Sequence, residues 1–61
     1  MKIGELRELS TEDLYQRLKE LRAELFSLRI QAAQGRAANP AQIRKVRKNV
    51  ARIKTLLSER Q

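Results

Sequence analysis

The 61-residue chain has no cysteine, histidine or tryptophan, and its only aromatic residues are Tyr15 and Phe26. Without cysteine or histidine it can form neither a disulfide framework nor a Cys/His zinc site. The chain thus lacks histidine as a general base and cysteine as a nucleophile, and its carboxylates sit among Lys and Arg on helix faces. We therefore expect neither an enzyme nor a cofactor. Two aromatics are too few for the stacking platform of a single-strand binder.

Glycine, proline and long apolar runs are also scarce. Gly4 and Gly35 are isolated, so no glycine-rich phosphate loop is present. No apolar run approaches the length of a signal peptide or a membrane span. The expectation is a cytoplasmic protein of one small domain.

Positive charge is abundant and concentrated in the last third of the chain. Fourteen Lys and Arg against seven Asp and Glu give a formal charge of +7. Residues 1–11 and 12–35 are each neutral, whereas 39–61 carry seven basic residues against Glu59. A localised positive field on a small chain favours nucleic acid or an anionic membrane surface over a small acidic substrate.

A long helix is predicted over 11–35. Ser10 can cap its start, Asp13 takes the capping-box position, and Leu9 can pack on Leu14. Gly35 offers a left-handed stop. Apolar residues follow at helical steps of four and three, which makes a narrow stripe: Leu14, Leu18, Leu21, Leu25, Leu28 and Ala32.

A second long helix is predicted over 40–59, after a turn at 36–39. Asn39 can cap it, Pro40 suits its first position, and Gln42 can complete the reciprocal cap. Its apolar stripe has the same alternating steps: Ile43, Val46, Val50, Ile53 and Leu57.

The two stripes predict an antiparallel hairpin. Pairing each residue of the first stripe, from Leu18 to Ala32, with one of the second gives position numbers that always add to 74 or 75. A constant sum is what an antiparallel seam requires, and a short connection favours antiparallel neighbours. The predicted fold is all-α, a single hairpin domain over 1–61. Residues 1–9 form an N-terminal flap in which Ile3 and Leu6 could cover Leu56 and Leu57.

Cations interleave with the second stripe. At roughly 100° per residue, Lys48 and Arg52 point away from it, with Arg47 and Lys54 at its edge. Arg44 and Lys45 complete this face, which suits phosphates and the shape of folded RNA. Arginine makes bidentate phosphate contacts, so the arginines are expected to matter most.

The first helix carries one large apolar side chain outside its seam. Phe26 needs a partner, either the flap or another molecule. With Tyr15 and Ile30 it is a candidate protein contact.

Other readings of the basic helix remain. A dimeric basic zipper would place its cations ahead of its heptads, and a membrane-surface helix would need a broader apolar face. A helical protein-interaction adaptor with a merely solvated basic face is the alternative that stays open.

The sequence also resembles a known family, the bacterial form of universal large-subunit ribosomal protein twenty-nine. The matching stretches include Glu24-Leu25-Phe26-Ser27-Leu28-Arg29, Asn39-Pro40 and, most specific, the run from Ile43 to Thr55, which reads IRKVRKNVARIKT. The resemblance implies a helical hairpin bound to large-subunit ribosomal RNA near the nascent-chain exit, without catalysis or a cofactor. It also implies a neighbouring ribosomal protein, number twenty-three, in the region where chaperone and targeting factors dock. DNA and membranes are not expected partners.

The resemblance implies that the residues at matched positions of this chain contact RNA. On the second helix these are Arg44, Arg47, Lys48, Arg52 and Lys54. On the first helix, Arg29 and Gln31 are weaker candidates.

Overall fold

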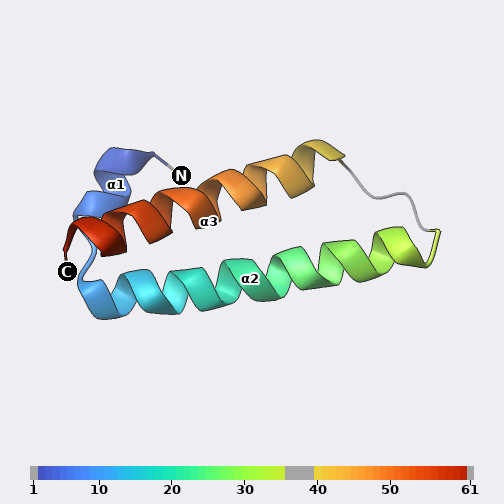
Figure 1. The fold of residues 1–61 in the computed structure, drawn as a ribbon, viewed down its shortest axis with the longest axis horizontal. Helices are drawn as coiled ribbons and strands as arrows, with labels where there is room; N and C mark the ends of the chain where they lie inside the picture. Colours follow the sequence, from blue (N-terminus) through green and yellow to red (C-terminus); the bar gives the residue numbers. More distant parts are fainter. Residues whose placement is uncertain (1, 36–39, 61) are drawn as a thin grey trace.

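The protein is a helical hairpin with a short third helix across one end (Figure 1). The computed structural model describes residues 2–35 and 40–60. Helix α1 spans Ile3–Arg7, α2 spans Thr11–Ala33 and α3 spans Pro40–Glu59. The two long helices lie side by side in opposite directions, and α1 packs on the C-terminal part of α3 (Figure 1). The predicted all-α hairpin with a short N-terminal helix is confirmed.

Local signals set both ends of α2. The extended Ser10 accepts a hydrogen bond at Oγ from the Asp13 amide at 3.1 Å, and Glu12 and Asp13 lie in the first turn, where the helix dipole favours acids. At the other end the Gly35 amide donates to the Ala32 carbonyl at 3.1 Å. Gly35 has φ +75°, a left-handed conformation that strains any residue with a Cβ. The helix therefore ends at Ala33, and Gly35 follows it as the stop.

The predicted cap of α3 by Asn39 lies outside the described residues. Gln42, its expected reciprocal partner, also makes a contact across the hairpin. Its Nε2 donates to Oε1 of Glu24 on α2 at 2.9 Å.

The two apolar stripes meet in one core. Its buried members are Leu6 of α1, Leu14, Leu18 and Leu21 of α2, and Val46, Ile53, Leu56 and Leu57 of α3. Leu25, Leu28 and Val50 pack against this cluster and are partly buried. Ala32 is exposed, α2 extends past the start of α3 (Figure 1), and the Gln42–Glu24 bond joins positions whose numbers add to 66. The helices are therefore antiparallel as predicted but offset along their axes, so the predicted register with sums of 74 or 75 is wrong. On α2, burial thus decreases with distance from α1.

Helix α1 widens the buried face of α3. Leu6 is fully covered, whereas Ile3 is 47% exposed, so only one of the two expected flap residues enters the core. On α3, Asn49 and Leu56 are buried in addition to the predicted stripe. Both follow from α1, because a third helix covers a side of α3 that two helices alone would leave in water.

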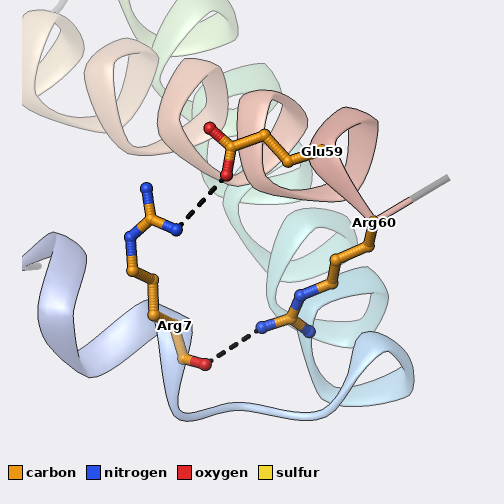
Figure 2. A network of polar contacts seen from close by, with 3 residues as sticks. All are labelled: Arg7, Glu59 and Arg60. Atoms are coloured by element: carbon orange, nitrogen blue, oxygen red, sulfur yellow. Dashed lines mark hydrogen bonds and ion pairs between the residues drawn. The ribbon is translucent and has the colours of Figure 1, made fainter.

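Arg60 fastens the N-terminal segment to the end of α3 (Figure 2). Its Nη1 donates to the Leu9 carbonyl at 2.8 Å and its Nη2 to the Arg7 carbonyl at 3.1 Å. Beside it, the Arg7 guanidinium pairs with Glu59 at 3.3 Å. The ion pair is exposed and contributes little. The Arg60 hydrogen bonds satisfy carbonyls in the connection between α1 and α2 and hold that connection in place.

Core burial predicts how two isoleucine substitutions differ. Ile53 is fully buried and Ile30 is 41% exposed. Ile53→Ala should lower the free energy of unfolding by about 2–5 kcal/mol, through lost burial and a cavity. Ile30→Ala should lower it by at most about 1 kcal/mol. Urea denaturation followed by circular dichroism measures both, and equal losses would contradict the assigned seam.

The Arg60 contacts predict a local effect. Arg60→Gln should remove about 1 kcal/mol of stabilisation from the α1 connection, so amide exchange at Leu6 and Leu9 should quicken about fivefold. Exchange at Leu21 and Val50 in the middle of the hairpin should stay unchanged. Lys54→Gln, which also removes one positive charge, is the control. Unchanged exchange at Leu6 and Leu9 in Arg60→Gln would show that Arg60 does not hold this connection.

Candidate nucleic-acid interface

The six predicted cations of α3 are all exposed, and they face different directions. Because the seam takes the side of Val46, Ile53 and Leu57, the 100° step places Arg44 and Lys48 on the back of α3. It places Arg47 and Lys54 on one edge, and Lys45 and Arg52 on the opposite side.

Five of these six cations have no partner in the part of the chain that the structure describes: Arg44, Lys45, Arg47, Lys48 and Lys54. Arg52 already takes part in an interaction within the chain. Arg44, Lys45 and Lys48 surround a shallow hollow with Ala41, near the start of α3. The positive end of the helix dipole adds to the field of these side chains.

The acidic residues of α2 lie along the other edge of the hairpin. The bond from Gln42 to Glu24 shows which flank of α2 faces which flank of α3. A second hollow, lined by Leu9, Asp13, Gln16, Arg17 and Glu20, places the α1 connection on this same acidic flank. Arg17 and Glu20 form an ion pair at 3.4 Å there. The acidic flank of α2 therefore lies opposite Arg47 and Lys54, whereas Lys45 and Arg52 are on the same side of the hairpin as the acids.

The two RNA candidates on α2 do not lie together. Gln31 is half-buried and falls on the acidic edge, seven residues or about two helical turns from Glu24. Arg29 is exposed and falls on the opposite edge, the one that carries Arg47 and Lys54.

The three candidate protein-contact residues are exposed on α2: Tyr15 and Phe26 lie on the flank that carries Arg22 and Arg29, and Ile30 is on the outer side. Phe26 is 66% exposed, Tyr15 52% and Ile30 41%. Since α1 packs on α3 and its connection runs along the acidic flank, the flap does not cover Phe26. Of the two partners expected for Phe26, only another molecule remains.

Sequence reasoning missed two residues that shape this interface. Arg60 was counted with the positive field but binds backbone carbonyls, and Asn49 was assigned to no face but is buried. Asn49 and Leu56 are seven residues apart, so they lie on the same face of α3. That spacing could have shown that α3 has a second buried face.

Two kinds of site are absent from the described residues. They contain no group of three or more acidic side chains that could hold a metal ion. None of their helices is both long and apolar enough to cross a membrane.

Comparison with known proteins gives the family. The family model for ribosomal L29 protein matches residues 4–60. The chain belongs to this family. A protein of Caldanaerobacter subterraneus subsp. tengcongensis named large ribosomal subunit protein uL29 is 61% identical over 61 residues, covering 100% of this chain and 92% of the relative. Proteins of the same name from Thermoanaerobacter sp. and Geobacillus stearothermophilus are 57% and 51% identical, with 88% and 92% of their lengths covered. The resemblance drawn from the sequence is confirmed.

Proposed function

We propose that this L29-family chain is a structural constituent of the large ribosomal subunit, in the bacterial cytoplasm, and that it binds large-subunit ribosomal RNA through the cations of α3. Its relatives are named for that subunit. The main contacts are Arg44, Arg47, Lys48 and Lys54, with Lys45 and Arg52 beside them. On α2, Arg29 lies on the same edge as Arg47 and Lys54. Gln31 lies on the opposite edge and would reach RNA only from there.

The observation that supports RNA binding is the set of five unpartnered cations between Arg44 and Lys54. Like charges at this spacing repel one another, and the acidic flank of α2 lies away from Arg44, Arg47, Lys48 and Lys54. RNA phosphates would remove that repulsion and release counterions. Ordered binding would also stabilise a hairpin with a small core.

The family resemblance supports a proposed position in the ribosome. The chain would lie near the nascent-chain exit, beside ribosomal protein twenty-three, where chaperone and targeting factors could reach it. Phe26, Tyr15 and Ile30 face outward from α2 and would contact a neighbouring protein. A structural role needs no catalytic group or cofactor, in agreement with a family of structural ribosomal proteins.

A second candidate function is a helical adaptor for proteins. Only the exposed Phe26 favours it. In that case the α3 cations would be solvated and would make no specific contact.

Salt dependence separates the two functions. Binding of the full chain to fragments of large-subunit RNA should weaken steeply with added salt, because each phosphate contact releases counterions. Removing two contacts in Arg47→Gln/Lys48→Gln should lower the slope of log affinity against log salt by about 2. Fluorescence anisotropy measures this slope.

The matched control is Lys19→Gln, which removes an exposed charge from the outer side of α2. Its slope should remain close to that of the unaltered chain. A flat salt response in the unaltered chain would favour the adaptor.

A further inference from the structure

The flank of α2 that carries Phe26 holds apolar surface between two arginines. Phe26 lies four residues after Arg22 and three before Arg29, spacings that make side chains neighbours on a helix. Ile30, four residues after Phe26, borders it on the outer side. Phe26 is 66% exposed and Ile30 41%, and both arginines are exposed. We call Arg22, Phe26, Arg29 and Ile30 the Phe26 patch.

Nothing in the part of the chain that the structure describes completes this patch. Helix α3 covers the seam of α2, and α1 packs on α3. The acids in the middle of α2, Glu20 and Glu24, lie on the opposite flank, where Glu24 bonds to Gln42. Arg22 and Arg29 have no partner within the described residues. The patch therefore presents apolar surface and two unneutralised positive charges to another molecule.

This composition favours protein over RNA as the partner. Aromatic residues and arginine are enriched in the desolvated centres of protein interfaces. RNA phosphates would pair with the arginines, but they would cover Phe26 and Ile30 with polar groups. A base could stack on Phe26, whereas the branched Ile30 beside it offers no flat surface for the next base. The back of α3, with Arg44 and Lys48, has no large apolar side chain among its cations and suits phosphates better.

We infer that the Phe26 patch docks on an acidic face of a protein resident in the large subunit. Apolar side chains of that protein cover Phe26 and Ile30, and its carboxylates pair with Arg22 and Arg29. Guanidinium groups bind carboxylates through two parallel hydrogen bonds, so the two arginines would fix the orientation of the partner. Charge complementarity of this kind also excludes partners with basic faces.

The partner is a permanent neighbour because the patch belongs to a permanent component. Under the proposed function the cations of α3 hold the chain on ribosomal RNA, so the patch stays at one place in the subunit. A factor that binds and leaves would expose Phe26 to water between visits, and permanent interfaces are the more apolar ones. The inference rests on the proposed protein contact of Phe26. It adds Arg22, assigns Arg29 to the protein contact and states the chemistry of the partner.

Photo-crosslinking in assembled large subunits tests the inference. Phe26 is replaced by benzoylphenylalanine, a photoreactive derivative that keeps the aromatic ring. The same derivative at the exposed Ser27 is the matched control, because this adjacent position points about 100° away, toward the acidic flank. Each full chain is reconstituted into large subunits that lack it, and these are washed free of soluble factors before irradiation. Mass spectrometry identifies the crosslinked protein or RNA.

The derivative at Phe26 should crosslink a resident ribosomal protein several-fold more than the derivative at Ser27. The crosslinked site should be apolar, with Asp or Glu close to it on the surface of that protein. Arg22→Glu in the same chain should lower the yield several-fold, because it places carboxylate against carboxylate. Arg17→Glu, the same change of charge on the acidic flank, should leave the yield unchanged.

Crosslinks from Phe26 mainly to RNA, or only after soluble factors are added, would overturn the inference. So would a yield no higher than from Ser27, a yield that Arg22→Glu does not change, or a partner surface without carboxylates. RNA binding by α3 is measured separately by its salt dependence, so it stands in each of these cases. If only the Phe26 derivative fails to enter the subunit, Ala33→Cys labelled with a benzophenone, on the same flank, takes its place. If no labelled chain enters the subunit, the proposed function fails together with the inference.

Discussion

The apolar contact between α2 and α3 is the interaction on which the rest of the molecule depends. Leu14, Leu18 and Leu21 on one helix and Val46, Ile53 and Leu57 on the other form most of the core. Once these side chains face inward, every other residue on both helices has a fixed direction. The seam thereby sends the acids of α2 to one edge and leaves the cations of α3 exposed.

The seam also keeps Arg47 and Lys54 on the edge opposite the acidic flank of α2. Surface ion pairs in the described structure are few, with Arg7 to Glu59 and Arg17 to Glu20 both exposed. Neither involves a cation of α3. The positive field is therefore left available for a partner, and the hairpin acts as a rigid support that fixes where the cations lie. Membership of the L29 family gives this arrangement a context in the ribosome.

The parts of the fold that depend on local spacing could be predicted from the sequence. Steps of three and four residues gave both stripes, the Ser10 hydroxyl caps α2, and Gly35 adopts its left-handed stop. The coverage of Leu56 was also expected, whereas the burial of Asn49 was not, because a polar residue outside the stripe gives no hydrophobic signal. The five residues of α1 are too few for a hydrophobic pattern that would show on which side of the hairpin this helix packs. The role of Arg60 could not be predicted either. The sequence does not show that the Arg7 and Leu9 carbonyls lie near this arginine, so it was taken for a surface charge.

The sequence predicted the individual residues of the candidate site but not how they are arranged on the surface of the hairpin. The sequence identified the cations of α3, and the helical step showed which of them leave the seam. It did not show that Arg29 and Gln31 lie on opposite edges, because that requires the side on which Glu24 meets Gln42. One hydrogen bond between the helices supplies that missing information.

The position of Arg60 near the end of the chain has a consequence for biosynthesis. The carbonyls that it binds belong to Arg7 and Leu9, more than fifty residues earlier. During translation the first segment must emerge long before this guanidinium exists, so α1 stays unfastened until synthesis reaches the last helical turn. Synthesis of the segment that carries Arg60 is then the event that allows the first helix to be fixed in place.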